Sequence, residues 1–225
     1  MRIRRAAAVG SGRRRALQAG ALAGPAFIVI YTVEGARRAA YDPLRHPVSS
    51  LALGPGGRVQ RLTFTILGLS YLGLSWGLRT APSDVTEPLL SALVAAAGVG
   101  LLSSAAAQTD PVSGYPPHTP AQMTEPTRHG TLHDLGALPV FLGIPAASLI
   151  SAARSARHQD RCWAGWSLSA ASSALIMLGL SLAAFRQHTM LVRWGGLFQR
   201  ISVMSCLGWL TTLATRALHH PTPRA

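Results

Sequence analysis

The chain has 225 residues, of which 48% are hydrophobic and only 13% are charged, about half the charged fraction of an ordinary soluble domain. Its formal net charge is +13, and every basic residue is an arginine. The arginines stand at the ends of apolar stretches and nowhere form a basic helix face interleaved with aromatic residues. This pattern excludes a nucleic-acid partner and predicts contact with a lipid bilayer and its anionic head groups.

Apolar stretches of roughly 17 to 24 residues follow one another along the chain, each long enough to cross a hydrocarbon core about 30 Å thick. They cover residues 16–33, 62–78, 89–107, 135–153, 162–185 and 197–215. The sequence therefore predicts an all-α fold, a polytopic membrane bundle with six transmembrane helices in one domain over residues 16–218. A basic cytoplasmic tail, residues 1–15, precedes this domain, and a short tail, residues 219–225, follows it.

The interiors of these stretches predict how the helices pack. Small residues four positions apart let helix backbones approach closely in lipid, and they occur at Gly73 and Gly77, Ala96 and Gly100, and Ser169 and Ser173. Pro139 and Pro145 lie inside the fourth stretch, where they predict a kink.

The flanking charges predict an orientation. Arg2, Arg4, Arg5, Arg13, Arg14 and Arg15 precede the first stretch, and the first flank usually dominates topology. We expect both termini to be cytoplasmic, and the Ala-, Gly- and Arg-rich, Lys-free composition indicates a bacterial inner membrane. Only two cysteines are present, Cys162 and Cys206, which excludes a disulfide framework and a thiolate metal site.

Polar residues of catalytic type gather in the loops on the predicted outer side, which include Asp42, His118, Asp134 and His188. The tightest group is His129 and His133, four residues apart at the start of the fourth span and therefore on one helix face. Two imidazoles in this arrangement supply half of a zinc site, which needs three or four nitrogen or oxygen ligands. Asp110 and His46 are the candidates for the remaining ligands, and Ser49 or Ser50 for a hydrogen bond to a ligand or water.

Each of these residues also has a structural interpretation. Asp110 precedes Pro111 at a helix end, where an Asx turn is common. Ser49 is suited to capping a short helix, and His129 and His133 are suited to the head-group zone. Around the last outer loop, Arg193, Trp194 and Arg200 are interpreted as interface anchors, with contact to anionic head groups as the alternative.

A series of short motifs resembles the bacterial membrane proteins of the domain-of-unknown-function 998 family. The motifs are His46-Pro47-Val48-Ser49-Ser50-Leu51-Ala52-Leu53-Gly54, Thr109-Asp110-Pro111, Gly114-Tyr115-Pro116-Pro117, Gly130-Thr131-Leu132-His133-Asp134 and Gly196-Leu197-Phe198-Gln199-Arg200. The resemblance covers about residues 16 to 218 and implies six helices without an established activity. It maps the family's Ser, Asp and His positions to Ser49 or Ser50, Asp110 and His133, and it leaves His129 outside the family pattern.

These patterns together predict a membrane protein with a Ser/Asp/His site at the outer face, whose catalytic residues are Ser49, Asp110 and His133. His46, Asp110, His129 and His133 are the candidate ligands of a zinc ion that activates water for hydrolysis of a lipid-like substrate. The alternative is a transporter or accessory, partner-binding membrane protein without catalysis. A haem-binding carrier is disfavoured because the histidines cluster at helix ends on one side.

Overall fold

The computed structural model describes residues 2–80 and 88–219, and this part of the chain consists of helices and loops. Most of the predicted C-terminal tail lies outside the described residues, except His219, which ends the last helix. The predicted basic N-terminal segment is helical from Arg2 onward and continuous with the first span. The α-helices are α1 Arg2–Arg37, α2 Gly57–Arg79, α3 Pro88–Ala106, α4 Arg128–Leu138, α5 Ile144–Arg157, α6 Arg161–Phe185 and α7 Gly195–His219.

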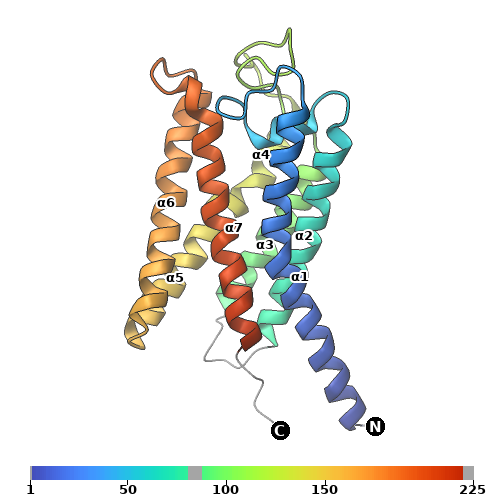
Figure 1. Cartoon of the computed structure of the whole chain (residues 1–225), viewed down its shortest axis with the longest axis vertical. Helices are drawn as coiled ribbons and strands as arrows, with labels where there is room; N and C mark the ends of the chain where they lie inside the picture. The colour runs from blue at the N-terminus through green and yellow to red at the C-terminus, as the bar shows by residue number, and fades with distance from the viewer. Residues whose placement is uncertain (1, 81–87, 220–225) are drawn as a thin grey trace.

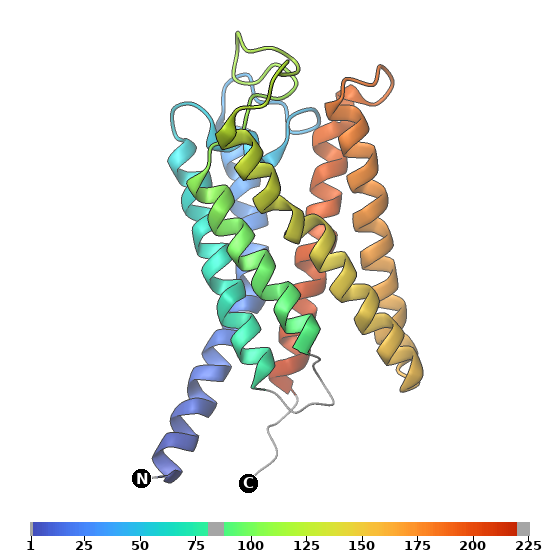
Figure 2. The same cartoon turned by 180° about the vertical axis from the view of Figure 1, so that it is seen from behind.

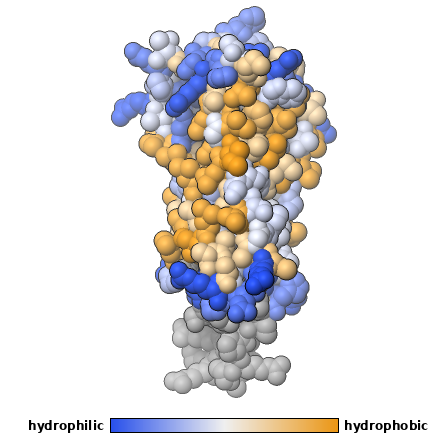
Figure 3. Space-filling model, turned by 90° about the vertical axis from the view of Figure 1, so that its left-hand side faces the viewer, coloured by the Kyte–Doolittle hydropathy of each residue, from blue (hydrophilic) through white to orange (hydrophobic). Residues whose placement is uncertain are grey.

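Five helical stretches among the described residues are long and apolar enough to cross a membrane. They are Gly10–Arg37, Pro88–Ala106, Arg128–Arg157, Arg161–Phe185 and Val192–His219. Helix α2 is 23 residues long, and its apolar part is shorter because Arg58, Gln60 and Arg61 occupy its first turns and Arg79 its end. The face of the molecule shown in Figure 3 carries an apolar band between two hydrophilic ends, as expected of a multi-pass membrane protein.

The helices form a ring in chain order. Helix α1 packs on α2, α2 on α3, α3 on α4, α5 on α6, and α6 on α7, and the ring closes where α7 packs on α1. The start of α1 and the end of α7 lie at the same end of the bundle (Figures 1 and 2), which we call the terminal end. The opposite end, formed by residues 38–56, 107–127 and 186–194, is the loop end. Residues 38–56 are the first loop and residues 107–127 are the third loop of the chain.

The fourth span is interrupted where proline predicts a kink. A π-helical segment, Pro139–Gly143, separates α4 from α5, and it redirects the chain so that α4 lies beside α3 while α5 lies beside α6 (Figure 2). In the π-helical register the carbonyl of Val140 would pair with residue 145, a proline without an N–H. The thiol of Cys206 donates to that carbonyl instead, at 3.7 Å.

Glycine permits the closest helix crossings. A side chain at Gly100 would overlap the carbonyl oxygen of Gly136, and a side chain at Gly136 would overlap that of Gly100, so α3 and α4 meet backbone to backbone. Gly68 and Gly98 form the equivalent crossing between α2 and α3. Gly77, one of the predicted small residues, faces Leu17 of α1.

At the terminal end, Arg13 forms hydrogen bonds to two neighbouring helices. Arg13 is buried at 8% exposure, and its guanidinium donates to the carbonyls of Gly77 in α2 and Ala217 in α7, at 3.2 and 3.1 Å. The last carbonyls of a helix lack intrahelical partners and carry partial negative charge. Arg13 therefore joins α1 to the carbonyl-bearing ends of α2 and α7.

We expect Gly100→Ala to destabilise the protein by about 1–3 kcal/mol, because a methyl group must push α3 and α4 apart at a rigid backbone contact. Gly179→Ala in α6 is the matched control, since nothing lies within 4 Å of its added methyl group. Thermal unfolding in detergent measures both. Equal melting temperatures for the two variants would show that the close crossing does not contribute to stability.

Candidate functional site

Arg200 of α7 holds the first loop against the bundle at the loop end. Its guanidinium donates to the carbonyls of Pro43, His46 and Gly196 and to the hydroxyl of Tyr41. The group also lies 5.6 Å from the ring centroids of both Tyr31 and Tyr41, a geometry in which cation–π attraction contributes. The structure thus corrects the interpretation of Arg200 as an interface anchor, because its donors are directed at the protein.

The neighbours of Arg200 complete this attachment. The side-chain carbonyl of Gln199 accepts from the backbone N–H of Val48 at 2.8 Å, and the N–H of Leu197 donates to the carbonyl of Leu44 at 3.0 Å. A side chain at Gly196 would overlap backbone atoms of Pro43 and His46. Residues Gly196 to Arg200 therefore bind residues Pro43 to Val48, and they hold the start of the 3-10 helix Val48–Ala52 at the loop end of the bundle.

His46 is engaged within the loops. It is buried at 6% exposure, and its Nδ1 accepts from the N–H of Asp42 at 2.8 Å. Burial, together with the nearby charge of Arg45, lowers the pKa of His46. Its ring lies 5.3 Å from that of Tyr115, centroid to centroid, so the first and third loops meet at these two side chains.

Asp110 fixes the start of α4. Its carboxylate accepts from the N–H and the hydroxyl of Thr127 at 2.8 and 2.6 Å. Thr127 is the N-cap residue, whose hydroxyl accepts from the N–H of Gly130 at 2.9 Å. A side chain at Gly130 would overlap the carboxylate. Asp110 thus places negative charge at a helix N-terminus, where the helix dipole stabilises it.

His133 is oriented by the backbone of α3. It is buried at 4% exposure, and its Nδ1 lies 3.1 Å from the carbonyl oxygens of both Ser104 and Ala107. Because a carbonyl only accepts, Nδ1 carries the proton and Nε2 of the neutral ring carries the lone pair. The hydroxyl of Ser104 in turn donates to the carbonyl of His133 at 3.0 Å.

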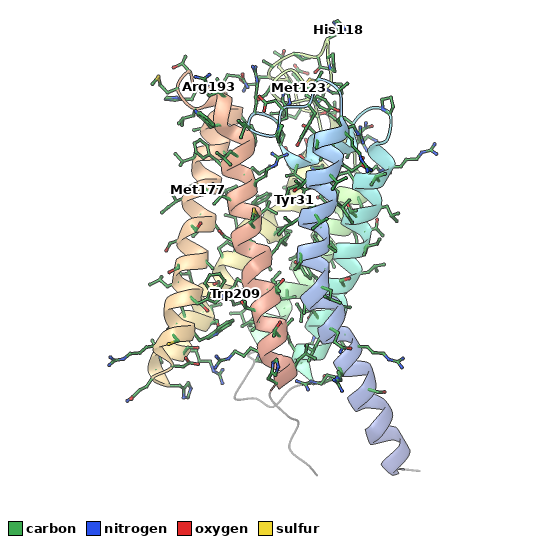
Figure 4. All side chains as sticks on the ribbon, in the orientation of Figure 1. Tyr31, His118, Met123, Met177, Arg193 and Trp209 are labelled. Carbon is green, nitrogen blue, oxygen red and sulfur yellow. The ribbon has the colours of Figure 1, made fainter. Side chains whose placement is uncertain are left out.

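The predicted ligands do not converge on one point. Within residues 2–80 and 88–219, no group of three or more His, Cys, Asp or Glu side chains is placed to hold a metal ion. Asp110 is directed at Thr127, His129 is exposed, and Nδ1 of His46 faces a backbone N–H. His118 lies at the tip of the third loop, away from the bundle (Figure 4). The zinc prediction therefore gains no support from the side-chain geometry.

A cavity of about 390 Å³ lies between the helices, below the loops. Its polar upper wall includes Ser49, Thr109, His133, Asp134 and Gln199. Its lower wall is apolar, formed by side chains of α1, α2, α3, α6 and α7 and of the π-helical segment: Phe27, Phe64, Leu67, Leu101, Phe141, Leu178, Val203 and Leu207. Of the predicted catalytic residues, Ser49 and His133 line this cavity, whereas Asp110 does not.

The cavity is covered at the loop end and open sideways. Pro47, Val48 and Val112 of the two loops form its roof. On the side, α4 and α6 do not pack on each other among the described residues, because the fourth span contacts α6 through the π-helical segment and α5. Leu138, Leu142 and Leu182 line the cavity and are also 47%, 48% and 50% exposed, so they mark a mouth on the side of the bundle.

The arrangement can be compared with known proteins. A family model described as Protein of unknown function (DUF998) matches residues 21–216. The chain belongs to this family. Comparison with curated proteins and with solved structures finds no match. The matched range includes all the residues that line the cavity and its roof in this DUF998 member.

Sequence reasoning missed three residues that assemble the loop end, namely Tyr41, Tyr115 and Gln199. The hydroxyl of Tyr41 accepts a hydrogen bond from the guanidinium of Arg200 and donates one to the carbonyl of Pro47 at 3.0 Å. The ring of Tyr115 packs on the rings of Tyr41 and His46. Tyr115, Gln199 and Arg200 belong to the motifs that carry the family resemblance. The motifs thus contained most of these residues, but only the fold shows that the last motif contacts the first.

We expect Arg200→Lys to destabilise the protein by about 2–4 kcal/mol, because an ammonium group cannot reach three carbonyls and a hydroxyl and leaves buried acceptors unpaired. Arg193→Lys is the control, since Arg193 is exposed and its guanidinium lies over Trp194. Thermal unfolding in detergent measures both. An Arg200→Lys protein as stable as the control would contradict the role of the guanidinium.

The lowered pKa of His46 predicts a dependence of stability on pH. Because the folded protein binds this proton less readily than the unfolded chain does, stability falls as pH drops below the ordinary histidine pKa of about 6.5. In His46→Asn, the amide oxygen can accept from Asp42 without titrating. We expect the melting temperature of the native protein to decrease more on acidification from about pH 7.5 to 5.5 than that of the variant. Parallel profiles would contradict this assignment.

Proposed function

We propose that this chain is a six-span membrane protein that binds a single-chain amphiphile, which enters the cavity from the bilayer between α4 and α6. The observation that carries the proposal is the mouth formed by Leu138, Leu142 and Leu182, which line the cavity and are exposed on the lipid side. In this proposal α2 is the sixth span. Its arginines lie near its ends, where Arg61 donates to the carbonyl of Ala105 at 2.9 Å.

The dimensions of the cavity support one chain rather than two. A volume of about 390 Å³ lies at the low end of the range of about 300–1,000 Å³ for drug-sized ligands. In depth the cavity extends from Ser49 to Leu207, which lies about 18 Å along α7 from Gly195 at 1.5 Å per residue. That depth is close to one leaflet, half of a hydrocarbon core about 30 Å thick. The polar upper wall then lies at the level of a head group.

Hydrolysis of the bound amphiphile is the second candidate, favoured by one observation. Ser49 and His133 both line the cavity, and Nε2 of His133 carries a lone pair that can accept a proton from a hydroxyl nucleophile or a water. The carbonyls of Ser104 and Ala107 occupy the position that a carboxylate takes in a catalytic triad. In this scheme Asp110 acts on the reaction only by positioning α4.

The test uses the protein in lipid nanodiscs and a photoreactive dodecanol with a diazirine near the end of its chain. We expect saturable labelling of the apolar wall at Leu101, Val203 or Leu207, identified by mass spectrometry of peptides. Val203→Phe fills part of the cavity and should reduce that labelling several-fold. Ile176→Phe is the control, because Ile176 is 60% exposed and lies away from the cavity wall.

Two outcomes would overturn the proposal. One is labelling confined to lipid-exposed side chains such as Ile176. The other is wall labelling that Val203→Phe leaves unchanged while the variant retains the melting temperature of the native protein.

A further inference from the structure

The polar upper wall has a charge and hydrogen-bonding character that indicates the head group. The only charged side chain that lines the cavity among the described residues is Asp134, and no arginine does, although the chain has a net charge of +13. From this wall we propose that the bound amphiphile has a protonated amine as its head group. The inference rests on the proposed function and adds the ligand class.

The head group must supply the specificity. A chain that moves from the bilayer into the cavity exchanges one apolar environment for another, so its methylene groups provide little net free energy. Hydrogen bonds and charge pairs at the polar wall are stronger there than in water because the surroundings have a low dielectric constant. The donors and acceptors of this wall therefore decide which head group binds.

The wall presents mainly acceptors. Nε2 of His133 has a lone pair and no hydrogen-bond partner among the described residues, because Nδ1 holds the ring proton. The hydroxyls of Ser104 and Ser181 donate to the carbonyls of His133 and Leu178, which leaves their oxygen lone pairs for another donor. Asp134, which follows His133 in α4, adds a carboxyl group to the wall.

The arginines near the loop end are committed to backbone carbonyls. Arg200 follows Gln199 of the cavity wall, but its guanidinium is held by Pro43, His46 and Gly196. Arg38 donates to Leu51 and Leu53 at 3.1 and 3.2 Å, and Arg61 donates to Ala105. A phosphate or carboxylate head group would meet the carboxyl group of Asp134 and find none of these guanidinium groups on the wall.

The remaining polar wall groups fit an amine as well. An ammonium group has three donors and no acceptor, which matches a carboxyl group, an imidazole lone pair and hydroxyl oxygens. The amide nitrogen of Gln199 and the hydroxyl of Ser49 are the donors that the wall offers, and both are neutral. A neutral alcohol can use these groups, but it gains no charge interaction with Asp134.

The experiment compares dodecylamine, dodecanol and dodecanoate as competitors of the photoreactive dodecanol in nanodiscs of zwitterionic lipid at neutral pH. We expect dodecylamine to displace the probe from Leu101, Val203 or Leu207 at a concentration about tenfold below that of dodecanoate. Asp134→Asn should reduce this preference to about threefold or less. Glu125→Gln is the matched control, because it removes a negative charge from the exposed third loop without altering the cavity wall, and it should keep the full preference.

The outcomes separate this inference from the proposed function. If dodecanoate competes as well as dodecylamine, or if Asp134→Asn keeps the full preference, the amine assignment is overturned while the cavity still binds amphiphiles. If the probe never labels the wall saturably, the proposed function itself fails. A tenfold preference that disappears in Asp134→Asn and persists in Glu125→Gln establishes the assignment.

Discussion

The bundle depends on hydrogen bonds from arginine side chains to backbone carbonyls at its two ends. Packing shields these carbonyls from water, and each buried, unpaired polar group costs free energy. Arg13 joins α1 to the ends of α2 and α7, and Arg200 joins α7 to the first loop. Arg38 and Arg61 do the same for the loop after α1 and the end of α3. One guanidinium can serve several carbonyls because it carries five donors in a fixed plane.

This use of arginine shapes the cavity. Its roof is built from the first and third loops, which Arg200 and the rings of Tyr41, His46 and Tyr115 hold together. The same bonds direct positive charge at the backbone and leave Asp134 as the charged group on the wall. A strongly basic protein thereby contains a cavity suited to a cationic head group.

The interrupted fourth span provides the opening. Pro139 and Pro145 remove two backbone donors, and the π-helical segment with the thiol of Cys206 accommodates that loss. Helix α4 stays on α3, held by the Gly100–Gly136 crossing and by His133, while α5 packs on α6. The direction of α4 therefore determines both the position of His133 and the gap that faces lipid. Asp110 belongs to this arrangement because it fixes the first turn of α4 through Thr127.

The sequence alone determined the class of the protein. Three local properties predicted a helical membrane bundle with a kink. They are the lack of charge over long stretches, the arginines at the ends of these stretches and the prolines in the fourth span. The motif series predicted the family, which the match over residues 21–216 confirmed. Five helical stretches of the described chain are apolar enough to span a membrane, while the count of six and the cytoplasmic termini stay predictions.

Only the tertiary structure decided what the polar residues contact. Residues from distant loops meet because the helices close into a ring in chain order, and no local pattern encodes which atom then faces which. Asp110 and His133 belong to neighbouring parts of the motif series, yet their side chains have different contacts. The carboxylate of Asp110 holds the N-cap residue of α4, whereas His133 lines the cavity. His133 and Ser49, which residue type marked as candidate catalytic residues, line the cavity, and their catalytic role stays a prediction. The sequence could not distinguish His133 and Ser49 from His46 and Asp110, because a hydrogen bond to a backbone group depends on the tertiary structure and not on the order of residue types.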